Sequence, residues 1–125
     1  MGRRKFILGL TFFFVAISLF AMSNNKNIKS DLVLNNGTRV VEYIPEGVCA
    51  RLISIEVSKE NIIEKVTFQG GCSGNAKGIG ALIRGMKVEE AAKRLKGIKC
   101  GNKTTSCPDQ LAKALIYMLN NKKNN

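Results

Sequence analysis

The stretch RVVEYIPEGVCARLISIEVSKENIIEKVTF, residues 39–68, decides the fold of this chain. Apolar and polar residues alternate with a period of two through most of it, which is typical of strands with one buried and one solvated face. Turn-forming residues interrupt the alternation at Pro45-Glu46-Gly47 and at Lys59-Glu60-Asn61. We therefore predict an antiparallel meander of three strands, at residues 39–44, 53–58 and 62–68.

The sequence that follows changes to a helical period. Apolar residues at i, i+3, i+4 and i+7 predict a helix over residues 88–95, which Gly97 ends. A shorter helix is expected over residues 77–84, with Gly85 after it. The fold class is therefore α+β, a small antiparallel sheet of about three strands followed by about three helices packed on one face.

The start of the last helix, near Cys107, has the clearest signals. Ser106 is placed as its N-cap, Pro108 lies in the first turn, and Asp109 completes a Ser-x-x-Asp capping box. A buried stripe follows, made by Leu111, Ala114, Leu115, Met118 and Leu119.

The regions outside this domain, which we place at residues 37–119, differ from it in composition. Residues 1–22 combine a basic start with the uncharged apolar run from Phe6 to Met22, which is typical of a signal peptide or a membrane anchor. The alternative is that translation starts at Met22 and that the start at Met1 is wrongly assigned. Residues 23–36 are rich in Asn and Lys and are expected to be a linker. Residues 120–125 are expected to be a disordered tail.

Charge and composition limit the chemistry. The chain has 125 residues, a net charge of +11, four cysteines and no histidine, which excludes histidine-based triads and histidine-ligated metals. From residue 77 onward eleven basic residues face three acidic ones. This basic half favours an anionic partner, such as a nucleotide, a nucleic acid or a lipid surface. The alternative is a solvated face, since its only aromatic residue is Tyr117.

The four cysteines, Cys49, Cys72, Cys100 and Cys107, each lie at or beside a turn. Metal-binding thiolates favour such turns, whose amides can hydrogen-bond the sulfur, and Cys107 is expected at a helix N-terminus, which favours a thiolate. The spacing lacks the Cys-x-x-Cys pairs of a zinc ribbon, so one metal site and one or two disulfides both remain open.

The segment Thr105-Ser106-Cys107-Pro108-Asp109 resembles the signature of the TSCPD family. The resemblance extends over Val48-Cys49, Gly70 to Asn75, Gly78-Ile79, Gly85-Met86 and Lys99 to Gln110, and covers about residues 38–119. The chain is similar to the short, stand-alone, four-cysteine members of that family.

The resemblance implies a shared metal site on Cys49, Cys72, Cys100 and Cys107, and zinc is the metal expected for four thiolate ligands. Asn75, Asn102, Ser106 and Asp109 are expected to hydrogen-bond around these ligands. The same module forms the C-terminal part of adenosylcobalamin-dependent ribonucleoside-diphosphate reductases. Because about eighty residues cannot enclose a reductase barrel, the resemblance implies an accessory or docking domain in deoxyribonucleotide and DNA synthesis, with a reductase or a nucleotide as partner.

Three alternatives accompany this interpretation. A thiol-disulfide relay to a reductase would use Cys100 and Cys107. A membrane-tethered, disulfide-stabilised domain would use the leader as a single-pass anchor or for secretion. We favour a cytoplasmic domain, because thiolate ligands need a reducing compartment. An anion could bind at Gly74, Asn75 and Lys77, although Ala76 and Gly78 around that lysine do not match a phosphate-binding P-loop.

Overall fold

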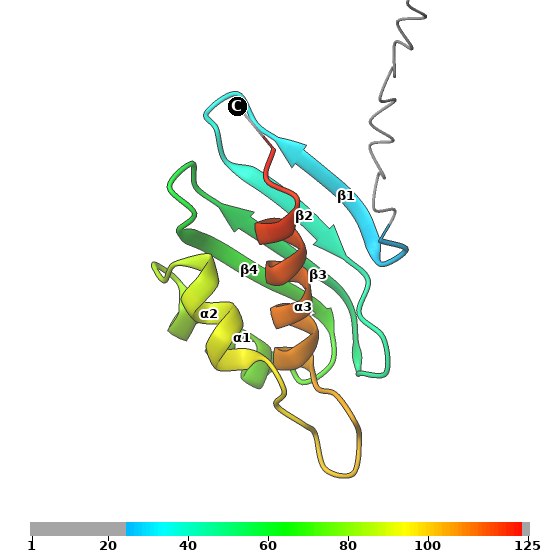
Figure 1. Cartoon of the computed structure of the whole chain (residues 1–125). Coiled ribbons are helices and arrows are strands. Elements are labelled where there is room, and N and C mark those ends of the chain that lie inside the picture. The colour runs from blue at the N-terminus through cyan, green and yellow to red at the C-terminus, as the bar shows by residue number, and fades with distance from the viewer. Residues whose placement is uncertain (1–24, 124–125) are drawn as a thin grey trace, which may run out of the picture.

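The computed structural model describes residues 25–123, which form a four-stranded sheet followed by three helices (Figure 1). The strands are β1 (Ile28–Val33), β2 (Arg39–Tyr43), β3 (Ala50–Val57) and β4 (Ile63–Gly70). The helices are α1 (Ser73–Ile83), α2 (Val88–Leu95) and α3 (Cys107–Asn120). The predicted α+β class is confirmed, with one strand more than expected.

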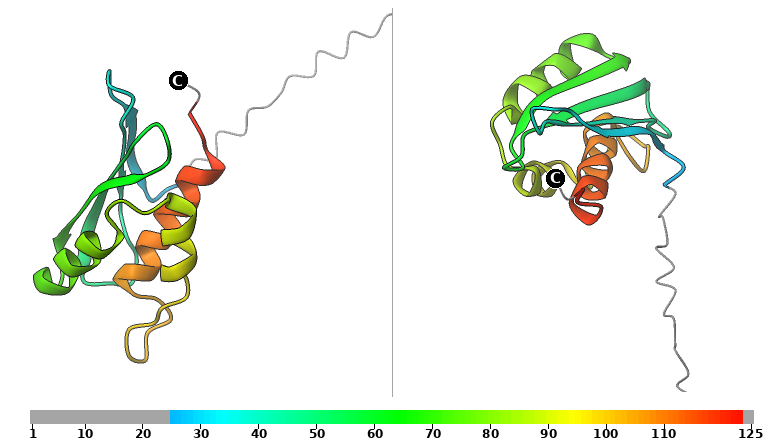
Figure 2. Two further views of the ribbon diagram at one scale, coloured as in Figure 1. Left: turned by 90° about the vertical axis from the view of Figure 1, so that its left-hand side faces the viewer. Right: turned by 90° about the horizontal axis from the view of Figure 1, so that it is seen from above.

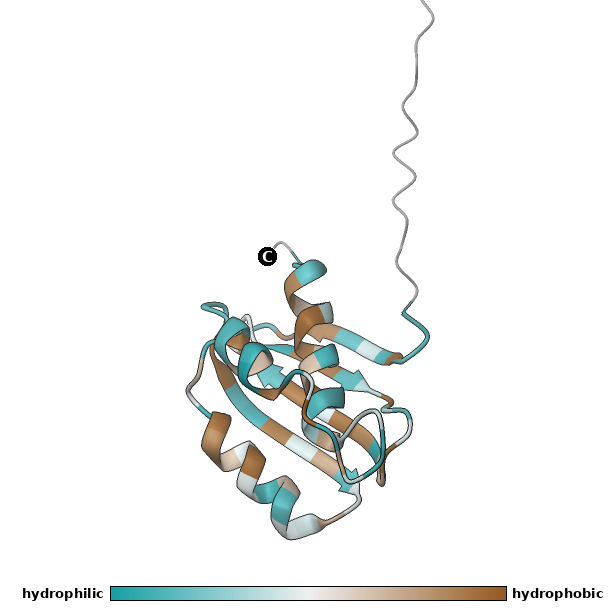
Figure 3. Ribbon diagram, turned by 60° about the horizontal axis from the view of Figure 1, so that its bottom comes forward, coloured by the Kyte–Doolittle hydropathy of each residue, from teal (hydrophilic) through white to brown (hydrophobic). Residues whose placement is uncertain are grey.

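The sheet is an antiparallel meander in the order β1-β2-β3-β4. Its register places Val41 opposite Ile55, and Ile55 opposite Val66. Buried and less buried residues alternate along β3, and Figure 3 shows the corresponding bands of hydrophobic and hydrophilic residues along the strands. One face of the sheet is therefore apolar and needs a cover.

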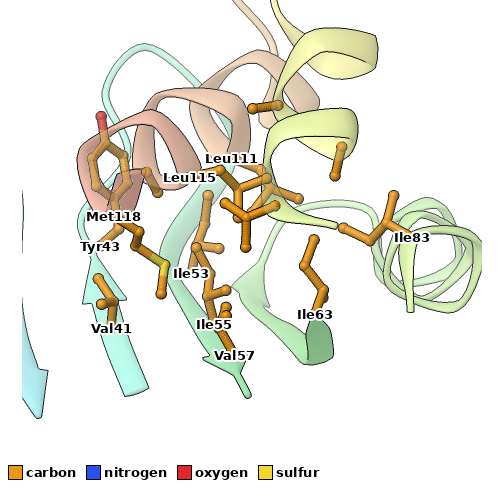
Figure 4. Close-up of a cluster of buried hydrophobic side chains, with 14 residues drawn as sticks. Val41, Tyr43, Ile53, Ile55, Val57, Ile63, Ile83, Leu111, Leu115 and Met118 are labelled. Carbon is orange, nitrogen blue, oxygen red and sulfur yellow. The ribbon is translucent and has the colours of Figure 1, made fainter. Parts of the chain in front are cut away.

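The helices supply that cover. Helices α2 and α3 pack side by side over the apolar face of the sheet (Figure 2), and α1 packs beside β4. Leu111, Leu115 and Met118 of α3 point toward the strands (Figure 4). The fully buried side chains at the centre of this core are Val41, Ile53, Ile55, Val57, Ile63, Val88, Leu111 and Leu115.

The expectation of a linker over residues 23–36 is wrong where β1 lies. Residues 28–33 pair with β2 as an edge strand, and an ion pair between Asp31 and Arg39 (2.7 Å) anchors it. The hydroxyl of Tyr117 on α3 also donates to Asp31, at 3.2 Å. An edge strand is half solvated, so its polar composition concealed a strand that tertiary contacts stabilise.

Several further boundaries differ from the sequence prediction: β3 begins at Ala50, three residues before the predicted start, and β4 extends to Gly70. Helix α1 begins at Ser73, four residues before the predicted start, because glycine at 74 lowers helix propensity without preventing a helix. Residues 120–125 are expected to be a disordered tail, but residue 120 is the last residue of α3. Lys123 also forms an ion pair, with its Nζ 3.8 Å from the Asp31 carboxylate. Helix α2 occupies residues 88–95 as predicted.

The apolar leader at residues 1–22 lies outside the described residues. Within residues 25–123, no helix combines the length and the hydrophobicity needed to cross a membrane.

Candidate functional site

All four cysteines line one cavity of about 480 Å³. Its lining residues come mainly from the end of β4, the starts of α1 and α3, and the residues around Cys49 at the start of β3. Most of the remaining lining is apolar or glycine, and its larger members are Phe68, Ile79, Leu82 and Pro108. Three segments that are distant in the sequence, with Cys49, Cys72 and the stretch from Cys100 to Cys107, thus line the same space.

Three of the thiols lie at or directly beside the start of a strand or helix, and the fourth lies in a loop. Cys49 directly precedes β3, and Cys72 is the N-cap residue of α1. Cys107 is the first residue of α3 and is partly buried, whereas Cys100 is exposed in the loop between α2 and α3. All four are free thiols, so this structure contains none of the disulfides that the sequence left open.

The donors suit a thiolate-binding metal in type, but their spacing is open. Four thiols with no histidine match the ligand number and softness that a tetrahedral zinc site prefers. Within residues 25–123, however, no three His, Cys, Asp or Glu side chains lie close enough together to hold a metal ion. The cysteines share a cavity without forming a compact ligand cluster.

The residues around Cys107 are held by buried hydrogen bonds. Ser106 Oγ accepts from the backbone N of Asp109 at 3.1 Å, which confirms the predicted N-cap, and donates to the carbonyl of Ile98 at 2.6 Å. The Asp109 carboxylate accepts from Gly97 N at 2.7 Å and from Thr105 Oγ1 at 2.5 Å. The Asp109 carboxylate therefore binds Gly97 and Thr105 of the α2–α3 loop. In the predicted capping box it would instead accept a hydrogen bond from the backbone N of Ser106.

The charge of Asp109 is stabilised by these partners. The hydrogen bond from Thr105 lowers the pKa of the Asp109 carboxyl, burial raises it, and the Gly97 amide with Lys113 and Lys96 lowers it further. The net pKa lies below its ordinary value, so the carboxylate is the resident form at neutral pH. Burial raises the pKa of the Tyr43 hydroxyl, and the negative charges of Glu46 and Asp109 raise it further.

Gln110 is a functional candidate that the sequence prediction did not include. Its side chain is 2 % exposed, accepts from Glu46 N at 3.0 Å and donates to Thr105 Oγ1 at 3.0 Å. The hydroxyl of Tyr43 lies 3.4 Å from the same Gln110 oxygen. The signal in the sequence was its position, four residues before Ala114 in the apolar stripe, where a polar residue must find buried partners.

The other predicted site residues lie around the cavity in different ways. Ser106, Gly74 and Asn75 line it, whereas Asp109 does not. Asn102 is exposed in the α2–α3 loop. Lys77 lies on α1, outside the lining of this cavity, so the structure does not bring it together with Gly74 and Asn75 there.

Comparison with known proteins places this site within a family. No curated protein and no solved structure matched the chain. The family model for the TSCPD domain matches residues 29–119, which include β1 and all four cysteines. The match begins earlier than the resemblance at residues 38–119 indicated, and it covers most of the chain. This chain therefore belongs to the TSCPD domain family.

Proposed function

We propose that this protein is a small metal-binding module that holds zinc with the thiolates of Cys49, Cys72, Cys100 and Cys107. The observation that supports this proposal is that all four cysteines line one cavity as free thiols. When bound, the metal would supply a structural cross-link between the end of the sheet and the starts of α1 and α3. A domain of this size gains stability from such a link.

Two of the thiols lie where helices begin. Cys72 and Cys107 occupy the N-terminal ends of α1 and α3, where free backbone amides could hydrogen-bond a metal-bound sulfur. The turn around Cys72 contains Gly70 and Gly71, both with positive φ, so its backbone approaches β3 closely. Four thiolates would be neutralised in part by a divalent ion, and zinc takes this ligand set readily.

Native mass spectrometry of the intact protein tests the proposal. We expect about one zinc per chain, and Cys→Ser at any of the four positions should lower both zinc content and thermal stability. Ser73→Ala, which changes the exposed residue next to Cys72 without removing a thiol, is the matched control and should retain zinc. Folded, metal-free protein with four titratable thiols would contradict the proposal. The same spectrum gives the mass of the native N-terminus and hence tests the leader.

We propose a ribonucleotide reductase, or the nucleotides on which it acts, as the partner of this module. The family resemblance supports the reductase, and the basic half of the chain after residue 76 supports an anionic surface. The role would be docking or accessory, in deoxyribonucleotide and DNA synthesis. Retention of a purified reductase on the immobilised full chain, lost in high salt, is the expected result; equal retention on a control surface that lacks the chain would contradict it.

A second candidate function is a thiol-disulfide relay through Cys100 and Cys107. Both are free thiols at the ends of one short loop, where Cys100 N donates to Thr105 O at 3.2 Å. Cys107 thiolate would attack a partner disulfide, release one partner thiolate and form a mixed disulfide. Cys100 thiolate would then displace the second partner thiolate, leaving a Cys100–Cys107 disulfide.

One variant separates the two functions. In a relay, Cys107→Ser abolishes reduction of the partner disulfide and leaves the fold intact, whereas in a metal site it lowers stability and metal content together. We place the domain in the cytoplasm, since either function needs reduced thiols. A membrane anchor or export through the leader is the alternative, and fractionation of cells expressing the full chain distinguishes them.

A further inference from the structure

The four thiols belong to two structural pairs. Cys49 and Cys72 flank the paired ends of β3 and β4, where Ala50 lies opposite Gly70; we call them the sheet-end pair. Gly71 lies so close to β3 that a Cβ there would be 3.3 Å from the Ala50 nitrogen. Cys100 and Cys107, at the ends of the loop into α3, are the helix-loop pair.

Gln110 connects the segments that position these pairs. Its Oε1 accepts from the backbone N of Glu46, in the loop that leads to Cys49, at 3.0 Å. Its Nε2 donates to the hydroxyl of Thr105, between Cys100 and Cys107, also at 3.0 Å. Among residues 25–123, one side-chain hydrogen bond joins the β2–β3 loop to α3, and Gln110 accepts it. The hydroxyl of Tyr43, at the end of β2, also donates to this Gln110 oxygen.

The connection continues beyond Gln110 through further buried and partly buried hydrogen bonds. Thr105 accepts from Gln110 and donates to Asp109, which in turn holds Gly97. The β2–β3 loop also lies beside Thr105, since a Cβ at Gly47 would be in van der Waals contact with Thr105 Cγ2, at 3.4 Å. No buried side-chain nitrogen or oxygen within the described residues lacks a hydrogen-bond partner, so losing Gln110 would leave buried polar groups unpaired.

We propose that Gln110 is a positioning residue that sets the distance between the sheet-end pair and the helix-loop pair. This inference rests on the proposed metal function, because a single tetrahedral ion with sulfur ligands at about 2.3 Å must reach both pairs at once. A residue that fixes their separation thereby fixes the affinity for that ion. Gln110 touches no thiol itself, and acts through Glu46 and Thr105.

The first test is the Gln110→Met variant of the full chain, which keeps the length of the side chain and removes its three hydrogen bonds, to Tyr43, Glu46 and Thr105. We expect zinc and cadmium to bind 10–100-fold more weakly, the range typical when a partner behind a metal ligand is lost. The charge-transfer absorption of bound cobalt should show fewer thiolates per metal. A folded Gln110→Met protein with unchanged affinity and cobalt spectrum would overturn the proposal.

Two further variants separate positioning from a general loss of stability. Met118→Ala truncates a buried residue about two turns further along α3 and should lower stability while leaving metal affinity unchanged. Gln110→Glu keeps the acceptor for Glu46 N and loses the Nε2 donor to Thr105, so it serves if the Met variant does not fold. We expect an affinity between those of wild type and Gln110→Met; wild-type affinity in Gln110→Glu would count against the proposal.

A metal-free measurement distinguishes failure of this inference from failure of the proposed function. Dibromobimane, which links two nearby thiols, is applied to chelator-treated protein, and the linked pairs are identified by mass spectrometry. Gln110→Met should reduce links between the two pairs several-fold and leave links within each pair unchanged. If the wild-type protein retains no metal but Gln110→Met still reduces these links, the metal site is refuted and the positioning role is upheld. If Gln110→Met leaves the links between the two pairs unchanged, the positioning role is refuted.

Discussion

At the scale of single residues, the TSCPD segment divides its work between chemistry and support. Cys107 faces the cavity, while Thr105, Ser106 and Asp109 are buried and form hydrogen bonds with the α2–α3 loop. The segment therefore does two things at once: it starts α3 and it holds the loop that contains Cys100. Replacing its polar residues should disturb the thiols without removing any of them.

Asp109→Asn tests this support. The substitution removes the charge that accepts hydrogen bonds from Gly97 and Thr105, and should lower the free energy of unfolding by about 2 kcal/mol at pH 7, a typical value for hydrogen bonds to a charged group. Urea denaturation measures the loss. A variant as stable as wild type would show that the carboxylate contributes nothing beyond an amide.

The pH dependence of the same difference follows from the lowered pKa of Asp109. Because the pKa is depressed in the folded state, the contribution is complete above the ordinary value of 3.8 and is lost as the pH falls through the lower folded value. The stability gap between wild type and Asp109→Asn should thus be constant from pH 7 to about pH 5 and shrink below about pH 4. A gap that grows in acid would contradict this assignment.

At the scale of elements, α1 is the least secured part of the domain. Only Ile83 of this helix is buried, Leu82 is 80 % exposed, and no side chain caps its N-terminus. It also contains Gly74, Gly78 and Gly80, which lower helix propensity. Gly80 has a packing reason, because a Cβ there would lie 2.9 Å from the carbonyl oxygen of Val66 on β4.

Two matched glycine substitutions test this description of α1. Gly78→Ala meets open space and should stabilise the protein by up to about 1 kcal/mol through helix propensity. Gly80→Ala gains the same propensity but pushes α1 away from β4, so it should be net destabilising. Urea denaturation, with hydrogen exchange of α1 amides, compares them; equal effects of the two would show that α1 does not pack on β4 as described.

At the scale of the whole molecule, one ionic cluster joins the beginning and the end of the described chain. Arg39 on β2 forms hydrogen bonds with Asp31 on β1 and with the carbonyl of Met118 on α3. Burial raises the pKa of Asp31, but the hydrogen bonds and charge of Arg39, with Lys123 and Tyr117, lower it by more. The cluster thus makes β1 part of the domain.

Arg39→Met should remove this attachment. It leaves Asp31, whose side chain is 8 % exposed, without its main partner, so we expect a loss of about 3 kcal/mol, in the range for breaking a buried pair. Hydrogen exchange should accelerate in β1. Lys29→Met is the control, because its ion pair with Glu42 is more exposed and should contribute less than about 1 kcal/mol. Similar losses in both variants would contradict the role of the cluster.

The sequence by itself determined the elements whose signals are local. The period-two alternation of β2, β3 and β4, the amphipathic stripe of α2 and the Ser106 cap of α3 are each contained within a few consecutive residues. Local sterics, capping and solvation decide such features, so they could be predicted without knowledge of the fold. The motif around Cys107 likewise identified the family that the domain match confirmed.

Only the tertiary structure decided what depends on distant partners. Strand β1 exists because Arg39 and Tyr117 hold Asp31, and Gln110 matters because Glu46 and Thr105 lie on either side of it. The sequence named the four cysteines, but their shared cavity follows from the way β3, β4, α1 and α3 meet at one end of the sheet. Pairing across dozens of residues leaves little local pattern, since its free energy arises only when the chain is folded.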